Sequence, residues 1–138
     1  MITKANRGSY FTATNENIKQ IITNEINRCG YNINLNDIDV SAVTDMSELF
    51  MNSAFNGDIS EWNVSNVTNM ESMFANSKFN GDISKWNVSN VTNVERLFAY
   101  SKFDGDLTHW RLKNAKHKNF YLSGTAIEKD KTRHPKFY

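Results

Sequence analysis

Three aspartates that recur at a fixed interval, Asp58, Asp82 and Asp106, are the strongest candidates for metal chemistry in this sequence. If they stacked on neighbouring repeats roughly 4.8 Å apart, their carboxylates would repel one another unless something neutralised them. Either each carboxylate accepts N–H groups in its own Asx-type turn, which the preceding glycine supports, or a cation bridges them. Calcium takes about 6–8 oxygen ligands, and no second acidic column is evident. We therefore favour the turn and predict no metal site.

The sequence offers no recognisable catalytic constellation. Its three histidines lie in the C-terminal third of the chain, and its single cysteine, Cys29, is far from them. The motifs H-E-x-x-H and G-x-S-x-G and the phosphate-binding P-loop are absent. We predict no enzymatic activity, no catalytic residue and no cofactor. Cys29 is interpreted as a small apolar residue at a helix end, with a reactive thiol as the alternative.

Three tryptophans, Trp62, Trp86 and Trp110, recur at the same interval as the aspartates. A ladder of indole rings could stack on bases or sugars, or it could lie in the core. The tryptophans occupy an inward-facing position of the repeat, so we interpret them as core residues. The same interpretation applies to the phenylalanines at positions 55, 79 and 103.

Polar residues between the inward-facing positions would align in columns on a solvent-facing strip when the repeats stack. One column changes from acidic to basic along the chain: Glu61 becomes Lys85 in the next repeat, one of only five differences between these two repeats. Such a graded strip would orient a protein partner of opposite polarity and raise its association rate, and a plain solvated face is the alternative. The predicted partner-binding residues are Asp37, Asp39, Glu61, Asn63, Lys85, Asn87, His109, Arg111 and Lys113.

These columns depend on a 24-residue repeat. Residues 55–78 and 79–102 are nearly identical, and residues 31–54 and 103–126 are degenerate copies of them. A fixed period of this length predicts a solenoid of stacked units. The 138-residue chain is accordingly divided into an N-terminal segment with a capping helix (1–30), a four-repeat solenoid (31–126) and a basic C-terminal tail (127–138). We expect the tail to be partly disordered, with Phe137 and Tyr138 as anchors.

Each repeat is expected to contain a turn, a short strand, a short helix and a return loop through Asn76 and Ser77. Asn56-Gly57-Asp58 and its copies indicate a turn with positive φ. The apolar positions that follow, Ile59 to Val67, have the spacing L-x-x-L-x-L of a leucine-rich-repeat strand. Thr68 and Glu71 form a capping-box pattern for a helix. Before the repeats, four isoleucines between positions 18 and 26 lie on one helical face, with Thr14 as N-cap and Gly30 after the C-terminus.

The repeat pattern F-N-G-D-I-S-x-W-N-V-S-N-V-T-N resembles the BspA-like leucine-rich repeat family, and in particular the repeats of mycoplasma surface lipoproteins. The match is specific at Phe55, Asp58, Trp62 and Val67 and recurs in the next repeat. The resemblance implies an α/β fold, a right-handed leucine-rich-repeat-type solenoid with stacked parallel strands. It also implies a role in binding proteins or surfaces, in a family whose members are usually secreted and anchored.

The distribution of charged and apolar residues bears on the partner and on the location of the protein. Residues 1–101 carry 7 Lys/Arg and 11 Asp/Glu, whereas residues 102–138 carry 9 and 4. The sequence contains no apolar run of about 18 residues, the length needed for a membrane-spanning helix, so we predict no membrane span. The first residues lack an apolar signal region, so we predict a cytoplasmic location, with secretion or the cell surface as the alternative.

Our prediction for function is a non-catalytic protein-binding module that occupies a partner's surface through the strip. Two alternatives remain: a structural or adhesive protein that is monomeric or stacks end to end, and a module that binds nucleic acid or another anionic surface. The basic residues that would serve nucleic-acid binding are Arg111, Lys113, Lys116, Lys118, Lys129, Lys131, Arg133 and Lys136.

Overall fold

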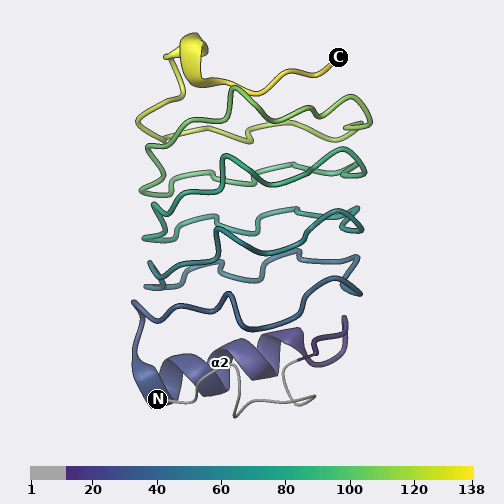
Figure 1. The fold of residues 1–138 in the computed structure, drawn as a ribbon. Coiled ribbons are helices and arrows are strands. Elements are labelled where there is room, and N and C mark those ends of the chain that lie inside the picture. The colour runs from purple at the N-terminus through teal and green to yellow at the C-terminus, as the bar shows by residue number, and fades with distance from the viewer. Residues whose placement is uncertain (1–11) are drawn as a thin grey trace.

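The computed structural model describes residues 12–138, in which the repeats form a stack of flattened coils (Figure 1). Isolated parallel bridges join equivalent positions of neighbouring repeats, such as Asp45 with Asn69 and Asn69 with Asn93. The helix α2, Ile18–Cys29, lies against the first coil, and the 3-10 helix η2, Lys131–Arg133, lies near the other end. The period of the sequence is therefore the register of the stack.

Helix α2 forms where the isoleucine pattern predicts it. Ile18 and Ile22 are buried, and Ile21 and Ile26 pack partly buried against the same core. Asn17, not Thr14, occupies the N-cap position, and Gly30 follows the helix with a φ of 88°. Thr14 instead donates its N–H to the Asn17 side chain. The first eleven residues of the predicted N-terminal segment lie outside the described residues.

The prediction of an α/β leucine-rich-repeat-type solenoid with strand–helix repeats is wrong. Among residues 12–138, α2 and η2 are the only helices, and the coils are joined by isolated bridges with no strand or sheet. The inward positions are correct, since Ile59, Trp62 and Val64 are buried. The chain between them bends, because Trp62 donates its N–H to the Ile59 carbonyl. Such turns interrupt what the apolar spacing predicted as a strand.

Asx turns bend the coils at three recurring positions. Asp58, Asn63 and Asn69 each accept the backbone N–H of the residue two positions on, at 2.9–3.1 Å. This explains why the capping box fails: Glu71 donates its N–H to Asn69, while Thr68 donates its hydroxyl to the Thr44 carbonyl of the preceding coil. Short polar side chains therefore satisfy the backbone here without a helix.

The segment predicted as a helix is a run of overlapping turns with a hydrogen-bond ladder to the next coil. Met70, Ser72, Phe74 and Asn76 donate their N–H groups to carbonyls of the following coil, at 2.8–2.9 Å. The intervening N–H groups close turns within the coil, as Met73 does to Met70. This alternation requires left-handed backbone at non-glycine residues, namely Glu48, Asn52, Ser72, Asn76, Arg96, Tyr100 and Phe120, with φ of 54–60°.

Aromatic columns fill the interior of the stack. The rings of Trp62 and Trp86 lie 6.4 Å apart, and those of Trp86 and Trp110 lie 6.3 Å apart. Each indole Nε1 donates to a carbonyl of the preceding coil, Trp86 to Ile59 at 3.0 Å. The three side chains are buried, so the interpretation of the tryptophans as core residues is confirmed.

The glycines of the Asn-Gly and Asp-Gly turns are needed for space and not for positive φ. Among the described residues, only Gly30 and Gly124 are glycines with positive φ. A Cβ placed on Gly57 would lie 1.9 Å from the carbonyl oxygen of Ile33 in the preceding coil. The predicted positive φ at these turns is therefore wrong, and close approach of the coils takes its place.

The C-terminal residues lie folded against the fourth coil, where the sequence led us to expect a partly disordered tail. Leu112 donates its N–H to Lys136, and Lys136 donates to Trp110, at 2.7 and 3.0 Å. Arg133 pairs with Asp104 at 2.8 Å and with Asp130 at 2.9 Å. Phe137 packs partly buried against the core, whereas Tyr138 is exposed. This segment covers one side of the last coil.

Candidate functional site

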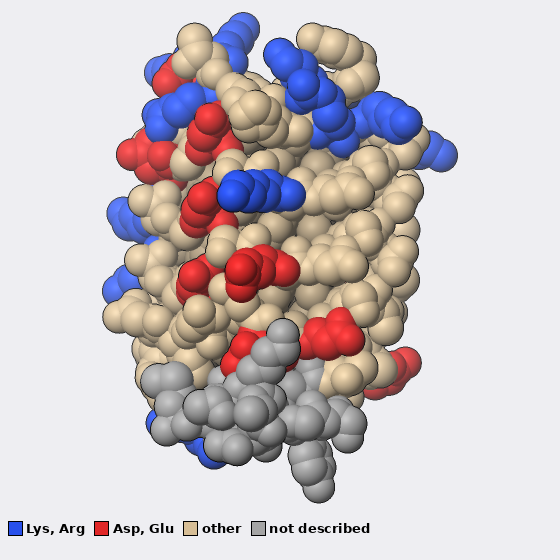
Figure 2. Space-filling model, in the orientation of Figure 1, with Lys and Arg blue, Asp and Glu red and all other residues tan. Residues whose placement is uncertain are grey.

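The predicted partner-binding strip lies on the surface of successive coils. All of its nine residues are exposed except Asp37, which is half-buried. Glu61, Lys85 and Asp82 line a small cavity of about 160 Å³ between two coils. Figure 2 shows that basic side chains gather at the C-terminal end of the stack, with acidic side chains over the coils below. The structure thus brings Glu61 and Lys85 together at neighbouring levels.

One column of this strip is engaged in local turns. Asp39 and Asn63 accept both the N–H and the hydroxyl of the serine two residues on, and Asn87 accepts the N–H of Ser89. Arg111, in the fourth coil, donates to the carbonyls of Thr108 and Trp110. These side chains therefore shape the coil. The other exposed residues of the strip are Glu61, Lys85, His109 and Lys113, which could contact a partner.

The aspartate column adopts the turn arrangement that the sequence favoured. Asp82 accepts the Ser84 hydroxyl at 2.7 Å and the Ser84 N–H at 3.0 Å, and Asp106 accepts the Thr108 N–H at 2.9 Å. Among residues 12–138, no group of three or more His, Cys, Asp or Glu is placed to hold a metal ion. The hydrogen bonds from Ser84 hold the pKa of Asp82 below its usual value, as those from Ser60 and Ser41 do for Asp58 and Asp39.

These turn aspartates predict a loss of stability in acid. A carboxylate whose pKa is lower in the folded than in the unfolded protein contributes stability above the unfolded value, about 4 for aspartate. That contribution disappears as the pH falls through the folded pKa. We expect the melting temperature to drop between pH 5 and pH 2, and Asp82→Asn, which keeps the acceptor oxygen, to lessen the drop. Calorimetry at several pH values measures this, and an identical pH profile for the variant would contradict it.

The basic residues proposed for anion binding are partly engaged elsewhere. Arg133 forms ion pairs with Asp104 and Asp130. The Lys118 ammonium lies 4.6 Å from the centre of the Phe137 ring. Lys113, Lys116, Lys129 and Lys131 are exposed. The basic end is therefore a mixed surface, in which several cations stabilise the C-terminal segment.

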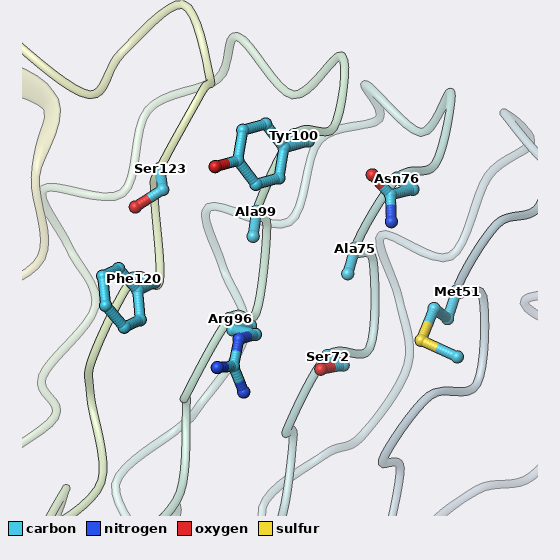
Figure 3. A pocket seen from close by; sticks show the side chains of 9 residues that line it. All are labelled: Met51, Ser72, Ala75, Asn76, Arg96, Ala99, Tyr100, Phe120 and Ser123. Atoms are coloured by element: carbon cyan, nitrogen blue, oxygen red, sulfur yellow. The ribbon is translucent and has the colours of Figure 1, made fainter.

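A second surface, which the sequence did not single out, is a groove between two rows of left-handed residues. It has a volume of about 370 Å³ and is open along the stack (Figure 3). Three neighbouring coils contribute equivalent positions, with Ser72, Arg96 and Phe120 on one rim. Asn76 and Tyr100 form the other rim, and small residues lie between them. We call this the outer groove; its lining residues are Met51, Ser72, Ala75, Asn76, Arg96, Ala99, Tyr100, Phe120 and Ser123.

The outer groove exposes two large aromatic side chains over a small-residue floor. Tyr100 is 68% exposed and Phe120 is 61% exposed, whereas Ala75 and Ala99 are buried. The Arg96 guanidinium lies 5.7 Å from the centre of the Phe120 ring and pairs with Glu95 at 3.2 Å. Arg96, Tyr100 and Phe120 have φ of 54–60°, and all three are exposed. Exposed Tyr, Phe and Arg around an apolar floor are the residues that most often anchor protein partners.

A signal for the outer groove is present in the differences between repeats. The five changes between residues 55–78 and 79–102 include two core exchanges, Met70 to Val94 and Met73 to Leu97. In the other three, the residue of the later repeat is exposed. One is Glu61 to Lys85, and the remaining two, Ser72 to Arg96 and Asn76 to Tyr100, both lie on the rims of the groove. Sequence reasoning missed them because it placed the first position in a short helix and the second in the return loop that follows it.

The fold and its surfaces define a repeat protein, a stack of turn-rich coils whose variable side chains are presented on a regular core. The chain belongs to the family described as Mycoplasma protein of unknown function, DUF285, whose model matches residues 12–134. This family agrees with the mycoplasma-type repeats that the sequence resembles. No curated protein and no solved structure matches the chain significantly.

None of the described helices is both long and apolar enough to cross a membrane. The cytoplasmic location stays a prediction.

Proposed function

We propose that the protein is a non-catalytic binding module that captures a protein partner through the outer groove. The observation that carries this proposal is the pair of exposed aromatic rings, Tyr100 and Phe120, beside Arg96 over a floor of buried alanines. A core that repeats almost unchanged supports surface positions that differ between coils. The relation of the repeats to those of BspA-like surface proteins, which the shared pattern suggests, supports the same role.

The chain supplies its own matched variants for a test. The double change Arg96→Ser and Tyr100→Asn replaces two rim residues with those at the same positions one coil earlier, Ser72 and Asn76. Those residues already adopt φ of 54–55°, so the backbone is preserved. The control is Lys85→Glu, which likewise installs the residue found at the same position of the preceding coil. This change reverses a charge on the predicted strip and lies outside the groove.

We expect the groove variant to lose partner binding while the strip control keeps it. Truncating anchor residues typically costs about 2 kcal/mol or more, roughly a 30-fold loss of affinity. The readout is capture of a partner from host cells, followed by titration of the purified pair with wild type and both variants. A partner that is lost with Lys85→Glu and retained by the groove variant would place the site on the strip instead.

A further inference from the structure

One edge of the stack ends in backbone donors that have no partner among residues 12–138. In the third coil, Val94, Arg96, Phe98 and Tyr100 donate their N–H groups to carbonyls of the fourth coil at 2.7–3.0 Å. The equivalent donors of the fourth coil are Lys118, Phe120, Leu122 and Gly124. Gly124 donates to the Glu128 carboxylate at 3.1 Å. Within residues 12–138, the N–H groups of the other three have no acceptor.

The C-terminal segment completes the stack on the opposite side of the same coil, where it accepts from Leu107 and Leu112 at 3.0 and 2.7 Å. At this open edge its Phe137 ring approaches, 4.6 Å from the Lys118 ammonium. At the open edge Lys118 is exposed and Phe120 is 61% exposed. Leu122 is buried. The unpaired N–H groups that belong to exposed residues are therefore those of Lys118 and Phe120, two residues apart, which is the spacing that each lower coil pairs with its neighbour.

The chemistry around the edge selects its occupant. Two N–H groups in ladder register require two carbonyl oxygens at alternate residues of an extended or turn-rich polypeptide, as in the addition of a segment to an open edge. Lys116, His117 and Lys118 are exposed there. Residues 102–138 carry 9 Lys/Arg against 4 Asp/Glu, so an acidic segment is complementary to this end of the molecule.

The exposed ring of Phe120 adds an apolar contact at the same place. Arg96, one coil below in the same row, covers one side of this ring at 5.7 Å. A residue one level above would occupy the next position of the row. Because Phe120 also lines the outer groove, the open edge continues that groove at the end of the stack.

We infer that an acidic peptide segment of a partner protein adds to the fourth coil as a partial fifth level. Its carbonyls accept from the N–H groups of Lys118 and Phe120, and its side chain in the outer row covers the Phe120 ring. This inference rests on the proposed function and names the chemistry of the partner and its register on the groove.

The probe is an N-acetylated, C-amidated peptide with the sequence of residues 44–52, TDMSELFMN, which carries two acidic side chains. In the first coil these residues are equivalent to residues 116–124 of the fourth coil. A fifth coil would place the same positions above residues 116–124, so the carbonyls of the peptide have the required spacing. Hydrogen exchange of the 138-residue protein is followed residue by residue by NMR. We expect saturating peptide to slow exchange at the amides of Lys118 and Phe120 roughly tenfold or more, with no change at Arg96 and Phe98, which are already paired.

Two controls give the result its meaning. The peptide with Asp45→Lys and Glu48→Lys should bind at least about tenfold more weakly at low salt. In the protein, Lys118→Glu should weaken the acidic peptide, whereas Lys129→Glu, an equal charge change at an exposed site on the basic end, should weaken it less. Equal losses in both protein variants would show general charge attraction and overturn the inference.

Three other outcomes also overturn it. They are no binding of the acidic peptide, binding without slower exchange at Lys118 and Phe120, and concentration-dependent protection of these amides without peptide, which would make a second copy the occupant. Failure here is distinguishable from failure of the proposed function. Suppose that a partner fails to bind the variant with Arg96→Ser and Tyr100→Asn and yet leaves the Lys118 and Phe120 amides of the wild type unprotected. That result would support the outer groove as the binding site and overturn the inference about the open edge.

Discussion

Replacing Phe74 with alanine should lower the free energy of unfolding by about 3–5 kcal/mol, the usual cost of emptying a buried aromatic site. Phe74 has no exposed surface and packs between the rings of Phe50 and Phe98, at 5.6 and 5.5 Å. It also contacts Phe79 at 4.5 Å. The cavity would interrupt the aromatic column between coils, and the rings above and below cannot collapse into it because the backbone ladder fixes their separation.

Urea unfolding followed by tryptophan fluorescence measures this loss, since the three indoles are buried at neighbouring levels. The control is Phe120→Ala, which removes the same side chain from a site that is 61% exposed. Changes at exposed positions are usually within about 0.5 kcal/mol. Equal destabilisation by the two variants would show that the buried column is not what holds neighbouring coils together.

The repeat period and the inward-facing positions could be predicted from the sequence, because both depend only on which residues are apolar and how often they recur. Trp62 and Phe55 are buried as their positions in the repeat indicate. The register of the stack follows from near-identity of the repeats, since identical segments bury identical faces. Helix α2 was equally accessible, because the isoleucines between positions 18 and 26 have a period that only a helix places on one face.

The backbone between the buried residues could not be predicted in the same way. The spacing L-x-x-L-x-L directs the same side chains inward from a strand or from a chain that turns after Asp58 and Asn63. Left-handed backbone at Arg96 and Tyr100 is unfavourable by roughly 1–2 kcal/mol per residue in isolation, so local propensity argues against it. The ladder between coils offsets this cost only after stacking, which no single repeat reveals.

The candidate site illustrates the same limit. The strip was identified from charge at Glu61 and Lys85, which sequence alone displays. The outer groove depends on left-handed backbone at Ser72, Arg96 and Tyr100, whereas the sequence predicted a helix at Ser72 and Arg96 and a loop at Tyr100. Variation between repeats marks surface positions, whereas only the backbone shows that two of the three changes to an exposed residue lie on one groove.

Replacing Gly57 with alanine is the second change for which we expect a large effect. The new Cβ would lie 1.9 Å from the Ile33 carbonyl oxygen, an overlap that forces two backbones apart. That carbonyl accepts the Asp58 N–H at 3.2 Å, so separation weakens one of the hydrogen bonds that join the first and second coils. Overpacking of this kind typically costs about 1–3 kcal/mol, and the lost bond adds about 0.5–1.5 kcal/mol.

The matched control is Gly81→Ala, which makes the same change one coil later. There a Cβ would meet mainly the Phe79 ring, at 2.7 Å, and the preceding coil's backbone oxygen only at 3.3 Å. A ring yields by a small rotation more readily than a hydrogen-bonded carbonyl, so Gly81→Ala should cost less. Urea unfolding gives the difference, and hydrogen exchange should show faster exchange at Asp58 in the Gly57 variant alone. If Gly81→Ala were as destabilising, the ring contacts and not the approach of neighbouring backbones would explain why glycine occupies this turn.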